Sequence, residues 1–313
     1  MELEGVDFSG AELEGANFGG KSLKGTLFAG ANLSGVNLEG MNLAEADFRN
    51  CNFTRSSLVG VCLRGANLSG ATLNGANLAS SDLSGASIRG ASFHGANLRN
   101  ATLAESDCTA SDFSQANLFK ATALRSSLKE ANLREVNLRG AKLQDCSLRG
   151  ASLEGADLSE ANLCGCELEG AKFDRSVVTD LRIENCAVRH TSWQRALLKE
   201  VHWEDLDFSE SDFYRASLLG AELRNINFRL SVFDWCDARG ALFENCDLRD
   251  SQLVGCRLEG ATFRKVDLRG ALIRETNFSG SVLEELNWEG VDFEELRTCK
   301  GLEEKSIVEL SLI

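Results

Sequence analysis

Cysteine, histidine and clustered carboxylates are the residues of this chain that could support chemistry, as metal ligands, disulfide partners or acid–base groups. The 313 residues include eleven cysteines and three histidines. Zinc sites usually contain closely spaced ligand pairs such as CxxC, and the sequence has no such pair. His94, His190 and His202 are scattered along the chain. We therefore expect no metal site and no cofactor.

Carboxylates gather in two short runs of the C-terminal half. Acidic cluster 1 consists of Glu204, Asp205, Asp207, Glu210 and Asp212. Acidic cluster 2 consists of Glu284, Glu285, Glu289, Asp292, Glu294 and Glu295. Acid–base catalysis requires a carboxyl group whose pKa is tuned by its surroundings, whereas these groups occupy positions expected to face solvent. No phosphate-binding glycine loop accompanies them, so the sequence predicts a protein that is not an enzyme.

A repeat of five residues positions all these side chains. From Leu3 to Phe293, every fifth residue is apolar, which gives 59 consecutive centres, and 48 of them are Leu or Phe. The exceptions include Val178, Ile183 and Trp203, and none of them is charged. A fixed short period indicates a stacked repeat architecture.

Each repeat has the same internal order. A small residue such as Ala31 lies two positions before the centre, and residues two apart on an extended segment point to the same side. The residue between them is usually polar, as at Asn32, and 27 of the 29 glycines end a repeat. Glycine at a fixed position marks a turn. We therefore expect three extended residues followed by a corner, coiled into a solenoid with an apolar interior.

The cysteines fit this interior. Most occupy the small inward position, and Cys146, Cys166 and Cys186 recur at intervals of 20 residues. Buried free cysteine behaves as a small apolar residue and is typical of a reducing compartment. With no signal peptide expected before the first repeat and no long apolar run, the sequence favours a cytoplasmic protein.

Segments such as Ala31–Gly35, Ala66–Gly70 and Ala156–Glu160 resemble the pentapeptide repeat, A(D/N)Lxx. The resemblance covers residues 1–295 without an insertion. It implies an all-β fold, a right-handed quadrilateral β-helix with four repeats per coil and nearly 15 coils. Residues 296–313 are expected to form a C-terminal cap with a short helix.

The resemblance also suggests a function, because some pentapeptide-repeat proteins mimic duplex DNA and bind DNA gyrase. Residues 141–313 hold 21 basic and 33 acidic side chains, whereas residues 1–140 hold 12 and 14. Duplex DNA carries about one charge per 1.7 Å, or about 40 over a rod of roughly 70 Å, against a net charge of −14 here. Mimicry is therefore expected only locally, at the two acidic clusters.

Outward apolar residues offer a second docking surface. Tyr214 and Trp235 are expected one coil apart on one face, with Leu230 and Val232 nearby. An exposed aromatic pair ringed by charge is typical of a protein-docking site. A neutral, asparagine-rich face that carries Arg99, Lys120 and Arg139 is another candidate, although three basic residues do not make a nucleic-acid-binding stripe.

The regular period stops after Glu295. An apolar pattern then predicts a short helix that caps the last coil, which a solenoid needs for solubility. Its apolar residues are candidates for a homodimer contact, as in related gyrase-protecting proteins: Leu302, Ile307, Val308, Leu310 and Leu312.

Two functions remain open from the sequence. The first is a non-enzymatic, DNA-mimicking rod that binds or protects a type II topoisomerase such as DNA gyrase and could confer antibiotic resistance. The second is a protein-interaction scaffold or effector that docks through the aromatic or neutral faces. Neither function involves direct binding to nucleic acid or to a membrane.

Overall fold

The computed structural model describes residues 3–19 and 23–302, and they form two compact units, Met1–Glu167 and Leu168–Ile313. In unit 1, parallel bridges join residues 20 apart, for example Asn52 with Thr72 and Asp112 with Asn132. This register means that four repeats complete one coil. The predicted β-helix is therefore confirmed, with the centres and the small residues of unit 1 buried from Leu23 onward.

The coil is closed by local bonds within each repeat and between neighbouring coils. At one corner of unit 1, the Ala31 N–H donates to the Phe28 carbonyl oxygen (2.8 Å), which turns the chain. The Phe28 N–H donates in turn to Asp47 of the next coil (2.7 Å). The last residue of nearly every described repeat has a positive φ, and where it is not glycine it is often Asn, Asp or Glu. Glycine adopts this conformation without a steric cost, which explains the periodic glycines.

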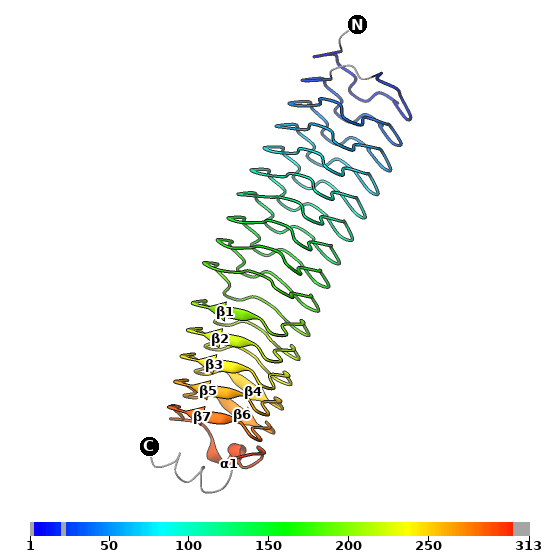
Figure 1. Ribbon diagram of the computed structural model, residues 1–313. Helices are drawn as coiled ribbons and strands as arrows, with labels where there is room; N and C mark the ends of the chain where they lie inside the picture. The colour runs from blue at the N-terminus through cyan, green and yellow to red at the C-terminus, as the bar shows by residue number, and fades with distance from the viewer. Residues whose placement is uncertain (1–2, 20–22, 303–313) are drawn as a thin grey trace. The chain divides into compact units, whose positions relative to one another are not determined.

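Unit 2 contains the strands long enough to be assigned as such. They are β1 (His202–Glu204), β2 (Glu222–Arg224), β3 (Leu242–Glu244), β4 (Gln252–Val254), β5 (Thr262–Arg264), β6 (Leu272–Arg274) and β7 (Val282–Glu284). Figure 1 shows β1, β2, β3, β5 and β7 stacked in that order as one parallel sheet, while β4 and β6 form a second. We name the four sides of unit 2 A, B, C and D, after repeats centred in one coil on Trp203, Phe208, Phe213 and Leu218.

Aromatic columns fill much of the interior of unit 2. On side C, Phe173 stacks on Trp193 with ring centroids 4.0 Å apart, and Phe213 stacks on Phe233 at 4.9 Å. Rings of side B meet those of side C edge to face, as Phe208 and Phe213 do with ring centroids 5.5 Å apart. Such stacked and T-shaped pairs stabilise a core beyond the area they bury.

One coil of unit 2 is open along side A and into side B. The Ile183, Asn185 and Val188 N–H groups find no acceptor in the described part of unit 2, whereas Phe173 and Arg175 on side C donate normally to Ser192 and Gln194. Figure 1 shows the correspondingly wide step between β1 and the coil before it. A cleft of about 220 Å³ lies there, and Leu181, Ile183 and Trp203 contribute to its lining.

Side-chain size explains this opening. The ring centroid of Trp203 lies 5.3 Å from that of Trp193 and 5.2 Å from that of Phe208. Two indoles therefore meet in one layer of the interior. Oversized groups in a packed core displace the backbone. The buried Trp203 Nε1–H also lacks a hydrogen-bond partner among the described residues.

The C-terminal end differs from the expectation. Helix α1 (Phe293–Leu296) begins inside the predicted repeat region, so the regular repeats end at Gly290 rather than at Glu295. The helical turn adds three residues to the 20-residue register. Asn277 accordingly pairs with Lys300, which is 23 positions on. Leu296 is fully buried. Of the helix predicted beyond this point, Leu302 is half-buried, and Ile307, Val308, Leu310 and Leu312 lie outside the described residues.

All eleven cysteines are free thiols, and seven of them are buried. Burial raises the pKa of the Cys51 thiol to about 11 and that of Cys108 to about 12. In unit 1, the side chain of Cys146 bonds to that of Cys166, and this bond lowers the pKa of the Cys146 thiol. No described helix has the length and the apolar character needed to cross a membrane.

These burial differences predict two classes of thiol. Because the thiolate is the reactive form, Cys51 and Cys108 are expected to react with a disulfide reagent at pH 8 at least about 100-fold more slowly in the native protein than in denaturant. The half-buried Cys62 and Cys164 are expected to react first. A stopped-flow thiol titration measures this, and the double variant Cys62→Ser/Cys164→Ser should reduce the fast phase, to which the half-buried Cys186 and Cys299 also contribute. A single rate for all eleven thiols would contradict the buried interior.

Candidate functional site

The two acidic clusters spread across several sides of a coil instead of forming rows along the axis. In cluster 1, Glu204 and Asp205 belong to side A and its corner, Asp207 and Glu210 to side B, and Asp212 to side C. The same positions of the next coil hold Arg224, Asn225, Asn227, Leu230 and Val232. Cluster 2 is distributed in the same way over the last coil and α1, and the side chain of Glu294 lies outside the described residues. The charge of cluster 1 is therefore spread over three sides of one coil, whereas the phosphates of DNA run along the duplex.

Side chains of neighbouring coils hold most members of cluster 1. Asn227 Nδ2 donates to Asp207 Oδ1 (2.8 Å), and Gln194 Nε2 donates to Asp212 Oδ2 (2.6 Å). These amides are neutral and leave the carboxylate charge in place, but the Arg189 guanidinium also lies 3.6 Å from Asp207 and offsets part of its charge. His190 Nδ1 lies 3.4 Å from Glu210. Asp205 and Glu285 make no side-chain bond within the described residues.

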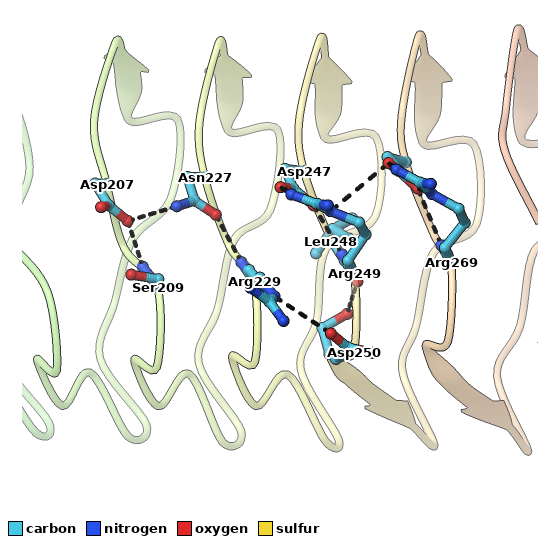
Figure 2. A network of polar contacts seen from close by, with 11 residues as sticks. Asp207, Ser209, Asn227, Arg229, Asp247, Leu248, Arg249, Asp250 and Arg269 are labelled. Atoms are coloured by element: carbon cyan, nitrogen blue, oxygen red, sulfur yellow. Dashed lines mark hydrogen bonds and ion pairs between the residues drawn. The ribbon is translucent and has the colours of Figure 1, made fainter.

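Farther along side B, arginines neutralise the carboxylates (Figure 2). Arg249 donates to both oxygens of Asp247 and lies 3.7 Å from Asp267. Arg269 is bonded in the same way to Asp267, and this hydrogen bond lowers the pKa of the Asp267 carboxyl. Such bidentate pairs fix orientation and reduce the local negative potential. Side B beyond cluster 1 is thus close to neutral.

The predicted apolar docking residues lie on side C and its two corners. Leu230 and Trp235 are 48% and 50% exposed, and they occupy the corners before and after the same repeat. Val232, between them, is half-buried and pairs with Asp212 and Gln252. Tyr214 is half-buried one coil earlier, where the Arg215 guanidinium lies 5.2 Å from its ring centroid. We call these four residues the side C patch.

Leu230 and Trp235 adopt an uncommon backbone conformation. Their φ angles are 60° and 62°, in the left-handed region that bulky side chains rarely occupy. Each such residue costs about 1–2 kcal/mol relative to a right-handed conformation. The same positive φ recurs at the last residue of nearly every described repeat, so it belongs to the fold; these two residues differ from most of the others because their exposed side chains are large and apolar.

The neutral face of unit 1 carries a ladder of asparagines. Asn97 Nδ2 donates to Asn77 Oδ1 (2.9 Å), and Asn97 and Asn117 form a parallel bridge. Beside this ladder, Arg99 and Lys120 lie 4.9 and 5.2 Å from the ring centroid of Phe119. The third basic residue, Arg139, is paired with Glu160. The face is therefore polar and largely satisfied by its own contacts.

Family comparisons agree with the register of 20. A family model described as pentapeptide repeats matches residues 7–40, 31–70, 66–104, 111–150 and 141–180, and one described as a pentapeptide repeat region matches 206–288. The chain belongs to the pentapeptide-repeat family.

Solved pentapeptide-repeat structures are similar at low identity. HetL, involved in heterocyst differentiation regulation in the cyanobacterium Nostoc, is 23% identical over 88% of this chain and 90% of its own, with a TM-score of 0.39. QnrB1, a plasmid-mediated fluoroquinolone resistance protein, is 21% identical over 58% of this chain and 91% of its own, with a TM-score of 0.37. No curated protein matches the chain.

The sequence reasoning missed one surface of this pentapeptide-repeat chain. Arg175, Arg195 and Arg215 occupy the corner after side C in three consecutive coils, and Trp235 follows them in the fourth. They are far apart in sequence, so a search for clusters of neighbouring residues does not find them. Sorting the last position of each repeat at intervals of 20 residues would have done so. We call these three residues the arginine corner.

Gly255 supports Trp235 and gives a direct test of its position. A Cβ atom at Gly255 would lie 2.7–2.9 Å from three atoms of the indole. We expect Gly255→Ala to displace the indole and to destabilise unit 2 by about 2 kcal/mol, since alanine also strains at positive φ. Chemical unfolding measures the stability, and the emission of Trp235 reports the displacement.

The matched control is Gly260→Ala, because Gly260 has the same φ of 67° but nothing within 4 Å of the added Cβ. Its loss of stability should reflect only the backbone strain of alanine at positive φ, and the emission of Trp235 should stay unchanged. If both variants lose the same free energy of unfolding and neither changes the emission, the contact between the indole and Gly255 is contradicted.

Proposed function

We propose that this pentapeptide-repeat protein is a non-enzymatic, cytoplasmic binding protein that docks a protein partner through the side C patch. The observation that supports this proposal most directly is the pair Leu230 and Trp235, two large apolar side chains that are about half exposed at the two corners of side C. Tyr and Trp are enriched among the residues that dominate binding energy at interfaces. The free thiols are consistent with a reducing compartment.

Affinity capture from host lysate tests the patch. The wild-type chain is compared with Tyr214→Ala/Trp235→Ala and with Val282→Ala, a matched control because Val282 is 43% exposed on side A, away from the patch. We expect the double variant to lose specific partners that the control retains. Retention of every partner by the double variant would remove the patch as a docking site.

Local DNA mimicry toward DNA gyrase is the second candidate. The observation that favours it is that a neutral amide holds Asp212 and that Asp205 makes no side-chain bond within the described residues, so cluster 1 keeps part of its charge. Against it, the charge is spread over several sides of a coil, and arginines neutralise the carboxylates farther along side B. Pentapeptide-repeat rods that mimic DNA would need acidic rows along the axis, so this candidate ranks below docking through side C.

A supercoiling assay with and without a fluoroquinolone separates the two candidates. Under mimicry, inhibition or protection should fade with added salt and disappear in the variant Glu204→Gln/Asp205→Asn/Asp207→Asn/Glu210→Gln. No effect of micromolar wild-type protein would eliminate gyrase as the partner. Docking through Trp235 should depend only weakly on salt.

Homodimerisation through the C-terminal segment is a further proposal. Sedimentation velocity of the full chain and of a 1–301 truncation tests it directly. We expect a dimer to become a monomer on truncation. An unchanged sedimentation coefficient, corrected for mass, would end the proposal.

A further inference from the structure

We infer that the arginine corner binds an acidic, leucine-containing extended segment of the partner protein. This inference rests on the proposed docking function and names the chemistry of the docked segment. It starts from Arg175, Arg195 and Arg215, which follow one another at a single corner of unit 2.

Backbone bonds fix the spacing of the three arginines. The Arg175 N–H donates to Gln194, that of Arg195 to Tyr214, and that of Arg215 to Asp234, at 2.8, 2.9 and 2.9 Å. Neighbouring coils therefore lie at the usual strand spacing of about 4.8 Å. All three residues are exposed and have φ between 57° and 59°. Three like charges at this spacing repel one another, which an anionic ligand would relieve.

The carboxylates near this corner are engaged elsewhere. Asp174 accepts a hydrogen bond from the Gln194 N–H (3.0 Å), and Asp234 accepts one from the Val254 N–H (2.9 Å). Within the described part of unit 2, most arginines make an ion pair, as Arg249 and Arg269 do on side B. Arg175, Arg195 and Arg215 make none. The corner thus presents a row of three guanidinium groups that no carboxylate binds within the described residues, on a chain of net charge −14.

Apolar groups border the row. Trp235 continues it in the next coil, and Leu197, 51% exposed, lies on the adjoining side D. The guanidinium fork matches a carboxylate, and side chains on one face of an extended segment recur about every 6.6–6.8 Å. Two carboxylates on one face of such a segment would therefore fit within a row of about 9.6 Å, followed by a leucine against Trp235. A long polyanion such as nucleic acid would meet repulsion from the acidic remainder of the chain.

Fluorescence provides the binding signal. Of the four tryptophans, Trp193, Trp203 and Trp288 are buried, so Trp235 is the one that responds to solvent and to a bound peptide. The probe is the acetylated, amidated peptide Glu-Glu-Glu-Glu-Leu-Leu, with Gln-Gln-Gln-Gln-Leu-Leu as its neutral match. Trp235→Phe should abolish the signal, which confirms its origin.

The test compares two triple variants of equal charge change. Arg175→Gln/Arg195→Gln/Arg215→Gln is expected to weaken binding of the acidic peptide about tenfold or more. The control, Arg55→Gln/Lys142→Gln/Lys265→Gln, should change it less than about twofold. The neutral peptide should bind at least about tenfold more weakly than the acidic one.

Four outcomes would overturn the assignment. They are equal binding of the acidic and neutral peptides, equal effects of the two triple variants, no binding of the acidic peptide at about 1 mM, and tighter binding of an oligothymidylate of equal charge. The lysate experiment distinguishes this inference from the proposed function. If Tyr214→Ala/Trp235→Ala loses its partners while the arginine triple variant keeps them, docking through the patch stands and the acidic segment is wrong.

Discussion

Replacing Trp193 by alanine is expected to lower the free energy of unfolding by about 3–5 kcal/mol. The indole is fully buried, stacks on Phe173 at 4.0 Å, and donates from Nε1 to Thr191 Oγ1 (2.9 Å). Removing it leaves a cavity at the meeting point of the side A, B and C columns and a buried hydroxyl that has lost a donor. Urea unfolding followed by circular dichroism measures the loss.

Trp235→Ala is the matched control, since it removes the same side chain from the surface. Its cost should stay below about 1 kcal/mol, because surface substitutions rarely cost more. Stacked repeats are stabilised mainly by their neighbours, so unit 2 should unfold first in Trp193→Ala, with unit 1 retaining its signal. Equal costs for the two tryptophans would contradict the assigned burial.

The open coil should be visible in hydrogen exchange. The Ile183 and Val188 amides are expected to exchange on the order of 10³-fold faster than those of Phe173 and Trp193 in the same unit. The physical reason is that the first two N–H groups lack an acceptor, while the latter two donate to Ser192 (2.6 Å) and Asp212 (2.7 Å). Nuclear magnetic resonance or peptide-level mass spectrometry resolves the difference.

Trp203→Leu provides the control for this second prediction. Leucine is the common residue at the centres and needs no hydrogen-bond partner, so the coil should close and the Ile183 amide should become protected. The variant is then also expected to be more stable than the wild type, because it removes the unpaired buried Nε1–H. Uniform protection of all four amides in the wild type would show that side A is closed.

The periodic core could be predicted from the sequence because each centre is set locally. A residue such as Phe113 needs only its own repeat and the two repeats 20 residues away to be buried, and the register of 20 follows from four corners per coil. The inward cysteines were predicted in the same way, and Cys51, Cys108 and Cys146 are buried. The C-terminal limit was wrong by one repeat, because Phe293 keeps the apolar period while its backbone turns into α1.

The candidate sites were less accessible, because a surface on a solenoid joins residues from different coils. Acidic cluster 1 is compact in sequence and is spread over three sides in space, whereas the arginine corner is dispersed in sequence and continuous in space. The sequence did single out Leu230 and Trp235, but it did not show their positive φ or the support of Trp235 by Gly255.

By itself, the sequence determined the solenoid and its apolar interior, because a strict period of five places every centre on the same side of the coil. The number of four repeats per coil came from the resemblance to the pentapeptide-repeat family, and the register of 20 confirms it. Only the tertiary structure decided where a coil fails to close and which guanidinium groups no carboxylate binds within the described residues. Both depend on residues that neighbouring coils bring together. The closure of a coil depends on the combined volume of Trp193 and Trp203 in one layer, and the pairing of an arginine depends on its distance from the nearest available carboxylate.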